Sequence, residues 1–408
     1  MDASRFADTI FGRPAREPGK QWSFTYYQPR EIPRTLSLDM SVVMELSTAD
    51  AALGNLAGIS TLISDPSLLI GPYLRREAVA SSRIEGTQAS LSDVLQAEIS
   101  PEPQNDDIAE VNRYLAATHH AYELSKELPI TSRMLLDVHR VLMSGVRGEE
   151  RNPGEFRTSP VWVGSAGATP ESAVYVPPLP SEIADLLGDW ERYVNEPSDA
   201  TPPLVRAALL HYQFETIHPF LDGNGRIGRL LINIFLKEQG RLPEPLLYLS
   251  NYFETHRHEY YDSLQGVRER GDINRWLSFF LRAVTAQSND AIKRSRQLIE
   301  LREEYRRIAA QDRSNLAGLV ELIVSNPFVT VKSAEQLGLT NQGTRNLLRR
   351  AESLGWLSSI GSIGGRGGRE AWVARDILRV MEAPMDYGET EPRGRGFSPS
   401  RTVEGHQN

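Results

Sequence analysis

Twelve consecutive residues, 218 to 229, hold the side chains best suited to chemistry, in the order HPFLDGNGRIGR. A base, His218, is followed four residues later by the carboxylate of Asp222, then by a Gly-Asn-Gly turn and by two arginines, Arg226 and Arg229. Glycines permit positive φ and leave backbone N–H groups uncovered, and a helix that begins here adds positive partial charge. The stretch therefore predicts an anion-binding nest with a base and a Mg²⁺-binding carboxylate at its edge.

Two predicted helices position this stretch. Residues 203–216 carry apolar side chains at helical spacing and lead into it, and the apolar run 230–236 follows at once. Taken singly, the parts have ordinary structural explanations, because a lone histidine is often structural and an aspartate before glycine is often turn chemistry. It is the combination at this spacing that indicates a site.

The stretch resembles the signature of the Fic family, HxFx[D/E]GNGRxxR. Every fixed position is met, namely His218, Phe220, Asp222, Gly223, Asn224, Gly225, Arg226 and Arg229. The resemblance covers roughly residues 35–290. It implies a mainly helical bundle with a small β-hairpin, and the transfer of AMP from ATP to a hydroxyl of a protein side chain.

The resemblance also implies a role for each side chain. His218 would act as general base on the incoming Ser, Thr or Tyr hydroxyl. Asp222 would hold Mg²⁺, and Tyr260 falls where the family places a residue against adenine. The residues expected to bind the nucleotide are Gly223, Asn224, Gly225, Arg226, Ile227, Gly228, Arg229 and Tyr260.

Residues 81–86 read SSRIEG at the end of a predicted helix of about residues 65–86. Ser81, Glu85 and Gly86 match the family's inhibitory motif, [S/T]xxxE[G/N]. A glutamate in a last turn closed by glycine is also an ordinary helix end, although the helix dipole disfavours it. The resemblance implies that Glu85, with Ser81, docks on Arg229 and inhibits the enzyme.

Residues 154–180 change in character and predict a hairpin, because the β-type run at 161–163 is followed by a Gly- and Pro-containing stretch and a second run at 173–176. An ordinary surface hairpin is one interpretation. The resemblance implies instead a flap that docks a target segment as an added strand. Its residues are Val161, Trp162, Val163 and Gly164.

The C-terminal part predicts a linker helix and a winged helix-turn-helix domain at residues 291–383. Residues 341–375 hold six arginines against two glutamates, which suits contact with DNA phosphates. Docking of another protein on the same surface stays open. Residues 384–408 are expected to be disordered.

Length and composition agree with this plan. The 408 residues suit two or three domains, which we place at 1–108, 109–290 and 291–383. The absence of cysteine excludes disulfides and cysteine-based sites. No long apolar run or apolar leader is visible, so we expect a cytoplasmic protein without membrane contact. A homodimer is left open.

Other functions share these residues. Within the family the same site can remove AMP from a modified protein or use another nucleotide donor. A third interpretation is a DNA-binding regulator in which the Fic unit is a sensor. The expected partners are ATP and a target protein that the sequence does not identify.

Overall fold

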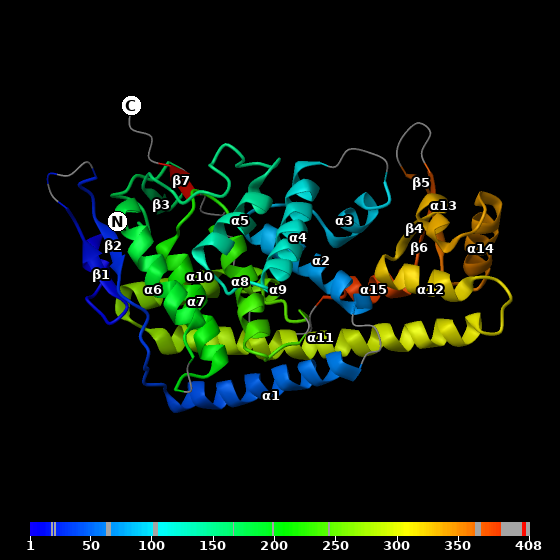
Figure 1. Cartoon of the computed structure of the whole chain (residues 1–408), viewed down its shortest axis with the longest axis horizontal. Coiled ribbons are helices and arrows are strands. Elements are labelled where there is room, and N and C mark those ends of the chain that lie inside the picture. Colours follow the sequence, from blue (N-terminus) through cyan, green and yellow to red (C-terminus); the bar gives the residue numbers. More distant parts are fainter. Residues whose placement is uncertain are drawn as a thin grey trace.

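The computed structural model describes residues 1–17, 19, 22–62, 67–100, 105–165, 167–197, 200–243, 245–363, 369–384 and 402–404. These residues form a mainly helical molecule, as predicted. Within them, no helix is both long enough and apolar enough to cross a membrane. The elements fall into an N-terminal region, a helical core and a C-terminal unit (Figure 1).

The N-terminal region begins with a small antiparallel pair of strands and continues with helices. Its elements are β1 (Gly12–Ala15), β2 (Tyr26–Pro29), α1 (Met40–Leu62), α2 (Ser67–Ile84) and α3 (Leu91–Ala97). Helix α2 is the predicted inhibitory helix. Its expected first residues, 65 and 66, lie outside the described residues.

The helical core is built around two buried helices that flank the signature. It comprises α4 (Asp106–Leu124), α5 (Ser132–Met143), β3 (Val161–Val163), α6 (Ile183–Asn195), α7 (Pro203–Ile217), α8 (Asn224–Glu238), α9 (Ser250–Thr255) and α10 (Arg257–Arg270). Helices α7 and α8 are buried along almost their whole length. A helix that is surrounded on all sides can carry apolar residues all round, as the run after Arg229 does.

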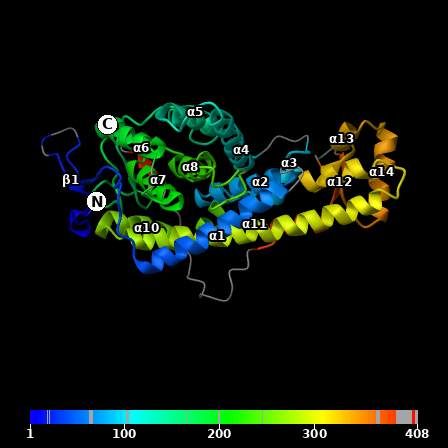
Figure 2. The ribbon, with the colours of Figure 1, turned by 60° about the horizontal axis from the view of Figure 1, so that its bottom comes forward.

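A single long helix, α11 (Ile273–Ala309), runs under the core and on to the C-terminal unit (Figures 1 and 2). Asp272 caps its start by accepting a hydrogen bond from the backbone N–H of Arg275. Helix α1 packs along it. The predicted boundary between residues 290 and 291 therefore falls inside one continuous helix, because the helical core and the C-terminal unit share α11.

The C-terminal unit contains three helices, a three-stranded antiparallel sheet and a last helix. Its elements are α12 (Leu316–Ser325), β4 (Phe328–Thr330), α13 (Val331–Ala334), α14 (Asn341–Ser353), β5 (Ser358–Ile363), β6 (Arg369–Val373) and α15 (Arg375–Glu382), with strand order β4-β6-β5. The unit is tied to the rest of the chain by Arg294 of α11, which donates to the carbonyls of Val380 and Ala383 at 2.6 Å.

The expected flap is smaller than a full hairpin. Strand β3 lies beside Tyr175 through an isolated bridge, and its other neighbour is β7 (Thr402–Glu404). Within the segment expected to be disordered, residues 384–408, residues 402–404 form strand β7 beside β3. Residues 385–401 and 405–408 lie outside the described part of the chain.

Candidate active site

His218 lies just after α7, and its backbone is in the left-handed region with φ of 51°. This conformation is uncommon for a residue other than glycine and marks a constrained position. The constraint comes partly from Arg157, whose Nε donates to the carbonyl of His218 at 2.8 Å and whose Nη2 donates to that of Pro178 at 2.6 Å. Arg157 thus ties the predicted flap segment to His218, the residue expected to act as general base.

The imidazole of His218 is neutral at neutral pH. Burial lowers its pKa to about 3, and the positive charges of Arg157 and Arg268 act in the same direction. A hydrogen bond to the backbone of Glu215 opposes the shift but does not cancel it. A neutral ring is the form that accepts a proton.

The turn before α8 is held by its own side chains. Gly223 has φ of 78°, which glycine adopts without strain, and Asn224 exchanges two hydrogen bonds with the backbone of Phe220 at 2.8 and 2.9 Å. The amide of Asn224 was expected to bind the nucleotide. In the structure this side-chain amide instead closes the loop, so it holds the backbone that forms the anion-binding nest.

The guanidinium of Arg226 is the clearest indication of an anion-binding site. It is buried, yet Nε and Nη1 have no hydrogen-bond partner. Only Nη2 is engaged, with the sulfur of Met143 at 3.5 Å and with Asp222 at 3.4 Å. Because buried donors without a hydrogen-bond partner are unfavourable, Nε and Nη1 are suited to an anionic ligand at the start of α8.

The carboxylate of Asp222 is 41% exposed beside Arg226. One oxygen accepts from the N–H of Gly223 at 2.6 Å, while a side chain on Gly148 would come within 3.1 Å of the other oxygen. The absence of a side chain at Gly148 thus leaves that oxygen open. Among the described residues no three His, Asp or Glu side chains form a metal cluster, so a metal here would depend on ligand oxygens as well.

Two nitrogens of Arg229 are engaged by the inhibitory motif. Its Nε donates to Oγ of Ser81 at 2.9 Å, and its Nη2 donates to the Ser81 carbonyl at 2.9 Å and to Oε1 of Glu85 at 2.7 Å. Burial disfavours the charged form of Glu85, but the arginine outweighs it and holds the pKa of Glu85 below its usual value. The structure thus brings together the two predicted partners.

Gly225 lies between these groups. A Cβ at this position would clash with the Glu85 carboxylate and would come within 2.8 Å of Nη1 of Arg229. Glycine is therefore required for the close approach of α2 to the first turn of α8.

Three expected nucleotide-binding residues face the interior. Ile227 is buried, and Gly228 packs against α7, where a Cβ would come within 2.7 Å of Glu215. Tyr260 is buried in an aromatic cluster, and its hydroxyl bonds to Nε2 of His211 at 2.8 Å. Its ring stacks on Phe253, so it has no free face for adenine.

The next residue, Tyr261, was not predicted and is better placed. Its side chain is 41% exposed, and Arg257 lies over its ring at 5.8 Å. Desolvation raises the pKa of its hydroxyl, and the negative charge of Glu85 acts in the same direction. Periodicity alone does not say which of two adjacent tyrosines faces inward.

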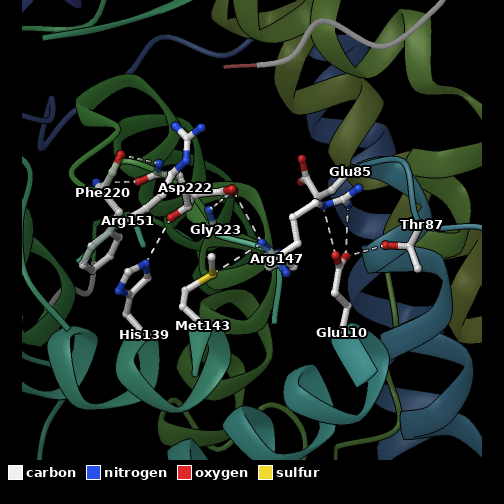
Figure 3. Close-up of polar contacts among 12 residues, drawn as sticks. Glu85, Thr87, Glu110, His139, Met143, Arg147, Arg151, Phe220, Asp222 and Gly223 are labelled. Carbon is white, nitrogen blue, oxygen red and sulfur yellow. Dashed lines mark hydrogen bonds and ion pairs between the residues drawn. The ribbon is translucent and has the colours of Figure 1, made fainter. Parts of the chain in front are cut away.

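His139 supports the turn. Its Nε2 lies 3.1 Å from the carbonyl of Asp222, its Nδ1 accepts from the N–H of Gly154, and its ring stacks on Phe220 at 3.8 Å (Figure 3). The loop after α5 was overlooked. It brings Arg147 and Gly148 beside Asp222, and no local motif marks it.

Comparison with known proteins agrees with the signature. Residues 43–123 match the family described as Fic/DOC family N-terminal, and residues 129–236 match the Fic/DOC family. A protein adenylyltransferase Fic of Culex quinquefasciatus is 38% identical over 151 residues, which cover 37% of this chain and 27% of that protein. The one of Drosophila yakuba is 36% identical over 166 residues, 40% of this chain and 30% of that protein. This chain thus aligns with less than a third of those relatives' length.

Solved structures share the fold. A Fic family protein from Desulfovibrio desulfuricans aligns with a TM-score of 0.54 at 21% identity, over 83% of this chain and 97% of that one. A fragment of Fic-1 from C. elegans aligns with a TM-score of 0.50 at 23% identity, over 62% of this chain and 74% of that one. The complete signature, the two matched regions and the shared helical fold together make residues 43–123 and 129–236 similar to the Fic/DOC family.

Proposed function

We propose that this protein is an adenylyltransferase that moves AMP from ATP to a hydroxyl group of a protein side chain and releases pyrophosphate. The observation that carries the proposal is Arg226, a buried guanidinium with two unpartnered nitrogens at the start of α8. Support also comes from the relatives named protein adenylyltransferase Fic. A triphosphate is an anion of suitable charge for this nest.

The positions of the side chains support the following reaction. The hydroxyl oxygen of the target attacks the α-phosphorus of ATP, and the bond from that phosphorus to the pyrophosphate oxygen breaks. The hydroxyl proton passes to the neutral ring of His218. Arg226, and Arg229 once it is free, stabilise the charge on the departing pyrophosphate.

A divalent cation fits the same site. Asp222 would hold Mg²⁺ through its open oxygen, and the ion would neutralise phosphate charge while the nucleotide supplies further oxygen ligands. The residues of the chain hold the carboxylate in place, because the backbone N–H of Gly223 fixes its other oxygen.

The contact between Glu85 and Arg229 supports autoinhibition. While Glu85 and Ser81 occupy its donors, Arg229 is withheld from the terminal phosphates, and ATP lacks the contact that would align its α-phosphate. Helix α2 then acts as an inhibitory helix.

The test is transfer of label from ATP that carries the label on its α-phosphate. We expect weak labelling of protein by the parent chain, labelling at least tenfold stronger by Glu85→Gly, and none by His218→Ala. ATP labelled on the γ-phosphate is the control and should leave protein unlabelled. An unlabelled Glu85→Gly protein that still binds ATP would contradict AMP transfer.

Removal of AMP is a second candidate, because the carboxylate of Glu85 is one-third exposed beside Arg229 and is free on that side to orient a water molecule. Protein labelled by the Glu85→Gly variant is a suitable substrate. Release of labelled AMP by the parent chain, and not by Glu85→Gly, would favour removal over transfer.

The C-terminal unit supports a winged-helix interpretation through its helix order and its sheet order β4-β6-β5. Of its arginines, Arg345 is paired with Glu370 and Arg350 with Asp312, both at 3.0 Å. DNA contact would therefore depend on the others, such as Arg349 on α14. A DNA gel shift that weakens steeply with salt, and weakens further in Arg349→Ala, is the expected result.

A further inference from the structure

The turn that follows α2 determines whether Glu85 reaches Arg229. Helix α2 ends at Ile84, so Glu85 lies beyond its last residue. The backbone continues through Gly86, with φ of 107°, and the N–H of Thr87 bonds back to the carbonyl of Ser82 at 3.2 Å. A carboxylate in such a turn needs support from outside the helix, since helix ends fray.

Helix α4 provides that support through two carboxylates on one face. Glu110 accepts from the hydroxyl of Thr87 at 2.8 Å, and Asp107 accepts from the N–H of Gln88 at 2.9 Å. Thr87 and Glu110 are both buried, whereas the Asp107 contact is exposed. The Glu110 contact is therefore the stronger restraint, because water does not compete for it.

Arg147 completes the environment of Glu110. Its Nε lies 3.1 Å from Oε1 of Glu110, and its Nη2 donates to Oε2 at 3.3 Å. Figure 3 shows Arg147 reaching from the loop beside Asp222 to Glu110, with Glu85 and Thr87 on the other side. The guanidinium provides the opposite charge that a buried carboxylate requires.

We infer that Glu110 is a positioning residue for autoinhibition. By holding Thr87, it keeps Glu85 on Arg229, and it links this turn to the loop that borders the metal-binding edge of the site. This inference rests on the proposed function for its effect on activity, but the restraint itself is a property of the fold. Weakening Glu110 releases Arg229 without altering Arg229, Glu85 or Ser81.

Two variants test the restraint in the full chain. Thr87→Val removes the hydroxyl donor at nearly constant volume, and Glu110→Gln removes the charge. The first readout is hydrogen exchange of the backbone amides of residues 85–87, which we expect to become at least fivefold faster in both variants. Glu123→Gln, an exposed change near the other end of α4, is the matched control and should leave this exchange unchanged.

The second readout is labelling with α-labelled ATP. We expect Thr87→Val and Glu110→Gln to be labelled at least fivefold more strongly than the parent, and Asp107→Asn less than either. In a Glu85→Gly background, Glu110→Gln should add nothing, because the contact that it supports is already gone. A purely structural role for Glu110 would instead lower labelling in both backgrounds.

The outcomes separate the inference from the proposed function. Unchanged exchange at residues 85–87 in both variants overturns the inference, whatever the enzyme does. Faster exchange together with a gain that persists in the Glu85→Gly background also overturns it, because Glu110 would then act on the site directly. If Glu85→Gly itself is unlabelled while exchange is faster, the proposed function fails and the restraint stands.

Discussion

Two arginines of the same helix, one turn apart, are in opposite states. Arg226 has two nitrogens without partners, whereas Nε and Nη2 of Arg229 are bound by Ser81 and Glu85. An anion that enters the nest therefore meets two open donors of Arg226, and an Arg229 whose charge is already paired with Glu85. Breaking the second pair leaves a buried charge exposed to the ligand, which is why a single carboxylate controls the site.

Tyr261, and not Tyr260, is expected to contact the base of the nucleotide. In a Glu85→Gly background, Tyr261→Ala should raise KM for ATP by roughly tenfold with a smaller change in kcat, because stacking on an aromatic ring contributes about 1–3 kcal/mol per base. Steady-state labelling at varied ATP concentration measures this.

Tyr260→Phe is the matched comparison. It removes the hydroxyl that bonds to His211 and should lower stability with little change in KM. If Tyr260→Phe raises KM while Tyr261→Ala leaves it unchanged, the assignment is reversed.

His139 makes stability depend on pH in one direction. Burial lowers its pKa to about 4, below the value near 6.5 of an unfolded chain, so the unfolded state binds more protons between these pH values. Its contribution is complete above about pH 6.5 and is lost as the pH falls toward 4.

The corresponding measurement is urea unfolding at pH 7.5 and pH 5.5. The parent should lose on the order of 1 kcal/mol more than His139→Gln over this interval, and the exposed His258→Gln should behave as the parent does. Equal losses in the parent and His139→Gln would show that the imidazole is accessible to protons in the folded protein.

At the scale of elements, α7 and α8 approach closely because α8 has glycine at position 228. A Cβ there would come within 2.7 Å of Oε1 of Glu215 and 3.2 Å of Nδ1 of His211, both of which lack partners. The close approach fixes α8 relative to the residue that follows α7, His218. The packing of α7 against α8 therefore sets the position of His218 relative to the anion-binding turn at the start of α8.

Gly228→Ala is expected to destabilise the protein by about 1–3 kcal/mol, because overpacking a dense interface displaces α7 from α8. Gly54→Ala in α1 is the control, since a Cβ there meets no atom within 4 Å, and it should stabilise by about 0.5–1 kcal/mol. Urea unfolding of both variants tests the pair. Equal effects of the two changes would mean that α7 and α8 are not packed as described.

The sequence predicted the parts of the site that depend on local pattern. The turn at Gly223 and the helix that begins after it follow from motif and spacing, whereas the pairing of Glu85 with Arg229 was implied only by the family resemblance. The sequence pattern alone did not predict which side chains are buried or which distant residues come into contact. The choice between Tyr260 and Tyr261 and the contact of Arg147 with Glu110 are decided by how distant helices pack, which no short window of residues encodes.

At the scale of the whole molecule, the long helix α11 runs between the helical core and the C-terminal unit, and the chain later returns from that unit to the core. The C-terminal unit lies at one end, but strand β7 lies at the other, against β3 (Figure 1). Val163 directs its N–H and carbonyl to residues 174 and 175. Along a strand, the backbone N–H and carbonyl groups of successive residues point to opposite sides. The backbone groups of Trp162 therefore face β7, and the edge of β3 that was expected to receive a target segment is already paired.

A disulfide tests this pairing, because the chain has no cysteine of its own. Val163 and Thr402 are register partners, and antiparallel partners of this kind lie within disulfide distance. The double variant Val163→Cys/Thr402→Cys should oxidise readily and lose both free thiols. Val163→Cys/Val403→Cys is the control, since adjacent strand residues point to opposite faces. Two free thiols in both variants would show that the flap edge is open.

The pairing has a consequence for target access. A target segment that adds to β3 must first displace residues 402–404, so part of its binding free energy is spent in competition within the chain. Removing residues 385–408 in a Glu85→Gly background should therefore raise labelling of an added target several-fold, with no change in KM for ATP. The cross-linked Val163→Cys/Thr402→Cys protein should show the opposite, and reduction should restore its labelling. Equal labelling in the truncated, cross-linked and reduced forms would mean that targets do not approach through β3.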